Sequence, residues 1–187
     1  MCQFLSALVL RNGDVLSHPM LDSHADLVTY FKLPDTSAKV HHFAKVELVP
    51  VDWLDPATWT WTVDENVLPI WWDEVAEAAE ATLRARAARM ILVDGTHRLI
   101  VDGSWLIGGT AIVHDVRGGR ILNVRDSAQI YDVRDSAQIR GVRGSAQIRG
   151  VGGSAQILNV RDSAQIRGVL GSVILDESAR AHVVAAP

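Results

Sequence analysis

The chain has 187 residues, of which 48% are hydrophobic and 21% are charged, so it can bury a core and does not have the composition of a disordered protein. Its one cysteine, Cys2, excludes an intramolecular disulfide and a four-cysteine metal site. The net charge of -4 identifies no partner, but nine arginines and seven acids lie in 109–177, against nine basic and fifteen acidic residues elsewhere. No apolar run is long enough to span a bilayer, and the apolar run near the start lacks a basic leader. We therefore expect a soluble, cytoplasmic protein.

The first part of the chain alternates between strand and helix signals. Residues 3–18 predict a β-hairpin, because Asn12-Gly13 tolerates the positive φ angles of a tight turn. Ser23 resembles the cap of a short helix that ends at Pro34. The alternation in 41–51 predicts a strand with one buried face, and 58–65 repeats that pattern.

The longest predicted helix runs from about residue 73 to 90. Acids occupy its first half and arginines its second, which matches the helix dipole at both ends. Val75, Ala79, Leu83 and Ala87 would face a core. We interpret 1–98 as an α+β domain that caps the segment after it, with 99–108 as a transition.

Residues 109–177 repeat a phrase of nine residues, Val-Arg-Asp-Ser-Ala-Gln-Ile-Arg-Gly, about eight times. A fixed period predicts stacked coils, hence a parallel β-solenoid. The third and ninth positions hold almost only Gly, Asp and Asn, which indicates corners at both. Between corners, Ser-Ala-Gln-Ile-Arg would form a strand, with Ala, Ile and the initial Val pointing inward.

The length of one coil has two candidate values. Two repeats, an 18-residue coil, would give two facing sheets, and three repeats, a 27-residue coil, would give a triangular prism. The small alanine position favours a thin interior and hence the 18-residue coil, which makes about four coils. Residues 178–187 are expected to form a tail.

An 18-residue coil places alternate repeats on the same side of the solenoid. One side would then be basic and is our predicted partner-binding surface: Arg125, Tyr131, Arg143, Arg149, Arg161 and Arg167. The other would be partly apolar and is our predicted self-association surface through Leu122, Leu158 and Leu170, together with Arg117, Arg134, Arg140 and Asp176.

Other residue patterns have weaker functional interpretations. Cys2 would be an N-terminal nucleophile if Met1 were removed, but such enzymes usually have Gly next and here Gln3 follows, so we expect no enzyme. The histidines, among them His18, His24 and His41-His42, lack metal-site spacing and are interpreted as surface residues, with no metal or cofactor. We expect the six tryptophans to belong to the core rather than to a stacking surface. The repeat also lacks the calcium-binding nonapeptide signature.

Several segments together resemble a known but uncharacterised group of proteins. These are FLSALVLRNGDVL, DSHADLV, FAKVELVP, TWTVDE and MILVDG, followed by repeats with a Ser-x-Gln-aliphatic core. The group is associated with phages, prophages and bacterial genomes. The resemblance implies mobile-element cargo and transfers no activity and no functional residue.

We therefore expect a non-enzymatic, phage-related binding protein whose basic solenoid face engages an acidic host protein, nucleic acid or anionic nucleotide. The resemblance adds interference with host defence as a role. The alternative is a self-assembling structural protein that forms oligomers or filaments. Ice or polysaccharide binding through the serine and glutamine rows is less favoured, because ice-binding solenoids usually carry threonine rows.

Overall fold

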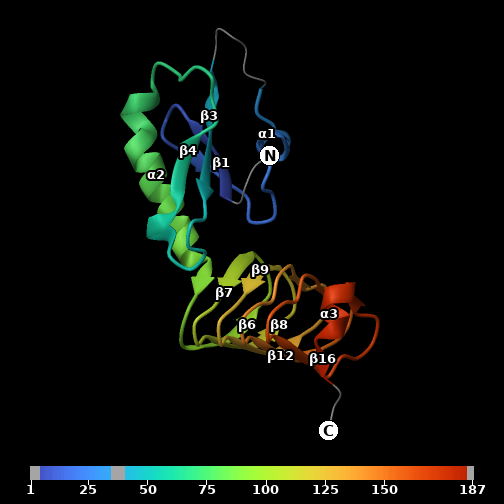
Figure 1. The fold of residues 1–187 in the computed structure, drawn as a ribbon. Coiled ribbons are helices and arrows are strands. Elements are labelled where there is room, and N and C mark those ends of the chain that lie inside the picture. Colours follow the sequence, from blue (N-terminus) through green and yellow to red (C-terminus); the bar gives the residue numbers. More distant parts are fainter. Residues whose placement is uncertain (1–4, 35–40, 185–187) are drawn as a thin grey trace. The chain divides into compact units, whose positions relative to one another are not determined.

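The computed structural model describes residues 5–34 and 41–184, and the chain forms two compact units, Met1–Arg89 and Met90–Pro187 (Figure 1). The first unit mixes strands and helices, and the second is a parallel β-solenoid. The predicted fold class is thus confirmed.

The first unit is built on a four-stranded antiparallel sheet with strand order β2-β1-β3-β4. The strands are β1 (Leu5–Leu10), β2 (Val15–Leu16), β3 (Phe43–Val49) and β4 (Thr60–Val63). Strands β1 and β2 form the predicted hairpin, and Gly13 in its turn has φ +86°. This angle is why the turn needs glycine.

Among the described residues of this unit, two α-helices and one 3-10 helix accompany the sheet. They are α1 (His24–Tyr30), η1 (Pro56–Thr58) and α2 (Trp72–Arg89). Ser23 caps α1, since its hydroxyl accepts a hydrogen bond from the Asp26 N–H at 3.5 Å, as predicted. Helix α2 is within one residue of its predicted bounds, and Ala79, Leu83 and Ala87 are buried.

The prediction of a single buried face for the strand at 41–51 is wrong. Phe43 and Glu47 are buried on one face of β3, and Ala44, Val46 and Leu48 are buried on the other. The reason is that β3 is a central strand of a sheet packed on both sides: α1 contributes Leu27 to a cluster with Leu8 and Phe43, and α2 contacts β1, β2 and β3.

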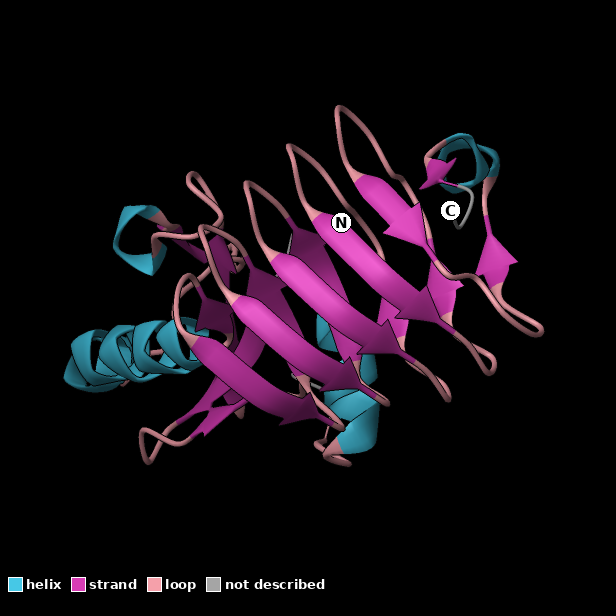
Figure 2. Ribbon diagram, turned by 90° about the horizontal axis from the view of Figure 1, so that it is seen from below, coloured by secondary structure: helices cyan, strands magenta, loops and turns pink. Residues whose placement is uncertain are grey.

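The solenoid consists of two six-stranded parallel sheets (Figure 2). The even sheet contains β6 (Thr96–Ile100), β8 (Ile112–Val116), β10 (Gln129–Val133), β12 (Gln147–Val151), β14 (Gln165–Arg167) and β16 (Val183–Val184). The odd sheet contains β5 (Ile91–Leu92), β7 (Ser104–Ile107), β9 (Arg120–Val124), β11 (Gln138–Ile139), β13 (Gln156–Ile157) and β15 (Ile174–Leu175). A short helix, α3 (Glu177–Ala181), precedes β16.

The strand register settles the length of a coil. Gln129 lies beside Gln147, and Gln147 lies beside Gln165, so each step between neighbouring coils equals two nine-residue repeats. Ile112 lies beside Gln129, and this step is one position shorter because the intervening repeat lacks one residue. Two repeats therefore make one coil, as preferred from the sequence, and the 27-residue coil is excluded.

The solenoid is longer at both ends than the repeat predicts. It has about six coils between Ile91 and Val184, rather than about four within 109–177. The expected transition, 99–108, lies inside the first coils, and the expected tail supplies α3 and β16. The first two coils lack the Ser-x-Gln phrase, yet they still supply inward residues such as Ile100 on β6 and Ile107 on β7, and this suffices for stacking.

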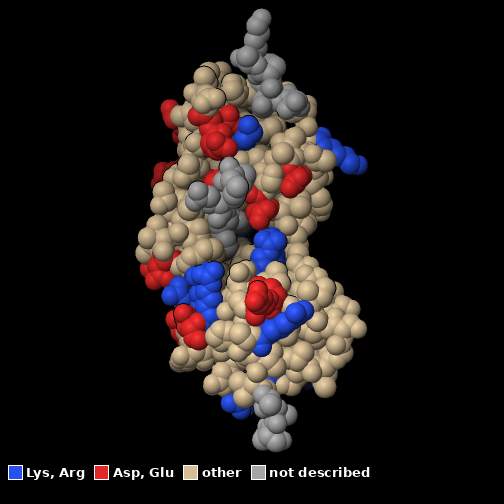
Figure 3. Space-filling model, turned by 45° about the vertical axis from the view of Figure 1, so that its right-hand side comes forward, with Lys and Arg blue, Asp and Glu red and all other residues tan. Residues whose placement is uncertain are grey.

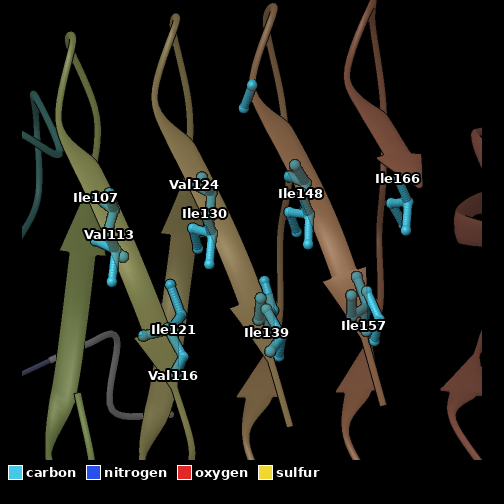
Figure 4. Close-up of a cluster of buried hydrophobic side chains, with 14 of the residues drawn as sticks. Ile107, Val113, Val116, Ile121, Val124, Ile130, Ile139, Ile148, Ile157 and Ile166 are labelled. Carbon is cyan, nitrogen blue, oxygen red and sulfur yellow. The ribbon is translucent and has the colours of Figure 1, made fainter. Parts of the chain in front are cut away.

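The core of the solenoid is a set of ladders formed by the inward residues of the repeat (Figure 4). Ile130, Ile148 and Ile166 follow one another on the even sheet, and Ile121, Ile139 and Ile157 do so on the odd sheet. The alanines of the fifth position, such as Ala128 and Ala146, are fully buried between them. The inward positions of Val, Ala and Ile are thus as predicted.

The corners are only half as predicted. All six third-position residues from Asp126 to Gly171 have positive φ, but among the ninth-position residues only Asn159 and Gly168 do. Asp132 and Gly150 of the ninth position lie inside strands, because each long strand begins at the glutamine and not at the serine. The third-position aspartates also join coils: Asp126 Oδ2 accepts from the Gly109 N–H, and Asp162 Oδ2 from the Gly144 N–H, both at 3.0 Å.

Candidate binding surface

The strand register sorts the outward arginines into columns. The first column, here called the arginine edge, contains Arg125, Arg143 and Arg161. The valines that precede these arginines are joined by parallel β-bridges between neighbouring coils, Val124 with Val142 and Val142 with Val160. The Arg143 N–H donates to Val124 O at 2.8 Å, and the Arg161 N–H donates to Val142 O at 2.9 Å. The arginine edge therefore lies in the turns that lead from the odd sheet to the even sheet, with one arginine in each turn.

The second column, here called the arginine–aromatic column, runs across the outer face of the even sheet. Its members occupy the outward position of successive strands: Arg98, His114, Tyr131, Arg149 and Arg167. The His114 and Tyr131 rings stack with centroids 5.1 Å apart and 13° between their planes. The Arg149 Cζ atom lies 4.8 Å from the centre of the Tyr131 ring, a cation–π contact.

The six residues predicted to share one side thus belong to two columns. Arg125 and Tyr131 stand six residues apart in one coil, and so do Arg143 and Arg149. Six residues span at most roughly 20 Å. Both columns can contact one partner surface, although they do not form one continuous stripe.

The arginines after the even sheet have a different environment. Arg117 Nε lies 2.7 Å from Asp115 Oδ2, and Arg134 bonds both Asp115 and Asp132 at 3.1 Å. The hydrogen bond and the charge of Asp115 raise the pKa of Arg117. These guanidinium groups are already neutralised by acids of the same chain.

Arginines of the fourth and fifth coils are not neutralised in this way. Within the described residues, no acid lies within ion-pair distance of Arg143, Arg149, Arg161 or Arg167, whereas Arg125 lies 3.5 Å from Asp126. Residues 141–168 contain these four arginines and one acid, Asp162. On the face drawn in Figure 3, basic and acidic side chains lie next to one another. The feature that distinguishes residues 141–168 is their four arginines with a single acid.

The three leucines of the predicted self-association surface do not form a continuous patch. Leu122 and Leu158 lie on the odd sheet with Arg140 between them, while Leu170 lies at the turn after the even sheet, in the column of Arg117 and Arg134. Leu170 is 75% exposed.

Asp176, from the same predicted side, has a structural role. Its carboxylate accepts hydrogen bonds from the Asn159 and Ala179 N–H groups, both at 2.8 Å, and caps α3. These bonds lower the pKa of Asp176 below its ordinary value. Asp176 therefore links the last coil to the coil before it and to the start of α3.

The structure adds a hollow that sequence reasoning missed. It measures about 990 Å³ and is lined by Thr96, Arg98, Leu99, His114, Asp115, Arg117, Tyr131 and Asp132. Counting one coil back from Tyr131 identifies His114, so the repeat contained this signal. Arg98 carried none, because its coil lacks the repeat phrase. Two arginines and two aspartates line the hollow, so its charge favours no anion.

The other sequence candidates have mixed outcomes. Cys2 lies outside the described residues. Trp59, Trp71 and Trp72 are buried, as expected of core tryptophans, whereas Trp53, Trp61 and Trp105 are only half-buried. The interpretation of the histidines as surface residues is wrong for His24, which is only 5% exposed because α1 packs it against β3. Within the described residues, no helix has the length and apolar character needed to cross a membrane.

Comparisons of the chain with protein families, with curated proteins and with solved structures give no match. The resemblance to a phage-associated group therefore stays a prediction from the sequence.

Proposed function

We propose that this protein is a non-enzymatic binding protein whose solenoid engages an acidic partner through the fourth and fifth coils. The observation that carries the proposal is the arrangement of Arg143, Arg149, Arg161 and Arg167. They stand in two columns on a rigid ladder, with no acid within ion-pair distance among the described residues. Guanidinium groups held at such fixed spacing suit bidentate hydrogen bonds to carboxylates.

An acidic protein is favoured over a nucleic acid for two reasons. The solenoid unit carries eleven arginines against nine acids, and the first unit carries seven basic residues against thirteen acids, so the chain lacks the large excess of positive charge that is typical of nucleic-acid-binding domains. The aromatic ring of the column is also occupied, because His114 stacks on Tyr131 and Arg149 lies over the same ring. Base stacking on Tyr131 would require both contacts to open.

Replacing Arg143, Arg149 and Arg161 with serine is expected to abolish partner capture. Each charge-assisted hydrogen bond contributes about 1.5 kcal/mol or more, so losing three weakens binding by at least roughly 1000-fold. The matched control replaces Arg117, Arg134 and Arg140, which removes the same charge from the same solenoid. Capture is measured by affinity purification from bacterial lysate with mass spectrometry, and by fluorescence anisotropy with labelled polyglutamate and oligodeoxythymidine.

Equal capture by the wild type and the first variant would rule out the proposed surface. Equal loss in both variants would mean that net charge, and not these columns, drives binding. Capture of oligodeoxythymidine in preference to polyglutamate would replace the acidic protein by a nucleic acid. Circular dichroism of both variants establishes that the solenoid is intact.

The proposal includes a biological setting that rests on the sequence resemblance alone. The protein would be cargo of a phage or another mobile element, act in the host cytoplasm, and bind a host protein of a defence system. Identical repeats such as 133–141 and 160–168 are consistent with recent duplication of the repeat.

Self-association is the second candidate function, and one observation favours it. Exposed apolar side chains gather in the last coil at Leu170, Ile174, Val183 and Val184, where β15 and β16 are the edge strands of the two sheets. An exposed edge of this kind can pair with another chain. Light scattering after size exclusion should then show a dimer or larger species that the double variant Ile174→Lys, Val184→Lys converts to monomer. A wild type that stays monomeric at high concentration would contradict this function.

A further inference from the structure

Three residues with metal-ligand side chains meet in the first unit, away from the arginine columns. They are His24 at the start of α1, Glu47 on β3, and Asp64 directly after β4. His24 Nδ1 lies 3.9 Å from Glu47 Oε1 and 3.4 Å from Asp64 Oδ2. Each residue offers one ligand atom, and the three atoms lie within 4.8 Å of one another. The three residues come from different elements and are far apart in the sequence, so they do not form a recognisable metal-binding sequence motif.

The other nitrogen of His24 fixes the state of the ring. His24 Nε2 lies 3.1 Å from the carbonyl oxygen of Val46, and this contact is buried. A carbonyl only accepts hydrogen bonds, so Nε2 carries a proton and donates it. Nδ1 is then the nitrogen that faces the two carboxylates. Metal-binding histidines commonly show this arrangement, with the far N–H held by a backbone carbonyl.

Burial and charge favour a cation between these groups. The side chains of His24 and Glu47 are 6% and 11% exposed, whereas that of Asp64 is 65% exposed. A buried carboxylate is costly unless a cation compensates it. Within the described residues, His24 is the one basic side chain within ion-pair distance of Glu47 or Asp64. A divalent ion would neutralise both carboxylates and leave the imidazole neutral.

We propose that His24, Glu47 and Asp64 bind one divalent transition-metal ion, with Zn²⁺ as the best match. One imidazole nitrogen with two carboxylate oxygens is a ligand set that zinc accepts, and it is too rich in nitrogen to be typical of calcium or magnesium. Three protein ligands leave a fourth position for water on the exposed side at Asp64. The ion would tie α1 to β3 and to the end of β4. The proposal is independent of the solenoid.

The test is a Zn²⁺ titration of the full, tag-free chain after EDTA treatment and dialysis. Isothermal titration calorimetry should give one site per chain, and Zn²⁺ should raise the midpoint of thermal unfolding. Asp64→Asn should weaken the affinity by at least about 100-fold, since even outer partners of a metal site contribute 10–100-fold. Because Asp64 is mostly exposed, this variant keeps its fold. Asp26→Asn removes an equal charge from an exposed position of α1 and should bind as the wild type does.

Absence of stoichiometric Zn²⁺ binding, or equal affinity in Asp64→Asn and the wild type, would overturn the proposal. The three side chains would then form a polar cluster that holds no metal ion. Co²⁺ provides a second readout, because its visible absorption bands should appear with the wild type and with Asp26→Asn, and disappear with Asp64→Asn.

Discussion

Replacing Ile148 with alanine is expected to lower the free energy of unfolding by about 3–4 kcal/mol, within the range for buried isoleucine to alanine changes. Ile148 is fully buried on β12, between Ile130 and Ile166 of the neighbouring coils. Backbone hydrogen bonds hold these coils one strand apart, so the walls cannot close around the missing atoms. Urea unfolding followed by circular dichroism measures the loss.

Leu170→Ala is the matched control. It removes a side chain of the same size from the same solenoid, but Leu170 is 75% exposed, so the change should stay within about 0.5 kcal/mol. Similar losses at both positions would mean that Ile148 does not belong to an internal ladder. A small loss in both would mean that neighbouring coils rearrange to fill the space.

The solenoid was predictable because the same pattern of inward and outward residues recurs in each repeat of its sequence. A period of nine, with Val, Ala and Ile at fixed positions, determines which side chains point inward, and the register confirms them at Ala128, Ile130 and Val133. The preference for two repeats per coil rested on the small alanine position, which fits two sheets at short distance. Stacking follows from local pattern alone, since each coil contacts only its neighbours.

The ends of the solenoid were not predictable from that pattern. Stacking requires inward apolar residues and a matching length, and it does not require the Ser-x-Gln phrase, so β5 to β7 join the ladder without it. Similarly, β16 pairs with β14 after the repeat has ended. A repeat defines where coils must occur, and tertiary pairing decides how far they continue.

The candidate sites also differ in this respect: the arginine columns depend on the local repeat, whereas the cluster of His24 with two acids depends on tertiary pairing. The columns that contain Arg143 and Arg149 follow from an 18-residue coil, so the sequence was sufficient to place them. Their separation into a turn and a strand was missed, because each strand starts later in the repeat than expected. The cluster of His24 with Glu47 and Asp64 depends on the pairing of β3 with β4 and on the position of α1. No local signal in the sequence specifies such contacts.

The close approach of successive coils leads to a second large effect, at Gly109. Gly109→Ala is expected to destabilise the protein by about 3 kcal/mol or more. Gly109 has φ +55°, which costs about 1 kcal/mol for alanine, and an added Cβ would collide with the backbone carbonyl of Val93 in the preceding coil. That carbonyl also accepts the Thr110 N–H at 2.9 Å, so it cannot move away without loss of a ladder bond.

Gly95→Ala separates the cost of the backbone angle from the cost of space. Gly95 also has positive φ, +72°, but the nearest atom to an added Cβ is 4.0 Å away, in the His97 side chain. This variant should therefore lose only about 1 kcal/mol, the cost of the left-handed angle. Urea unfolding of both proteins gives the difference directly, and it should be about 2 kcal/mol or more in favour of Gly95→Ala. Equal losses would mean that the coil containing Gly109 does not lie directly against Val93, because only direct stacking makes the two glycines differ.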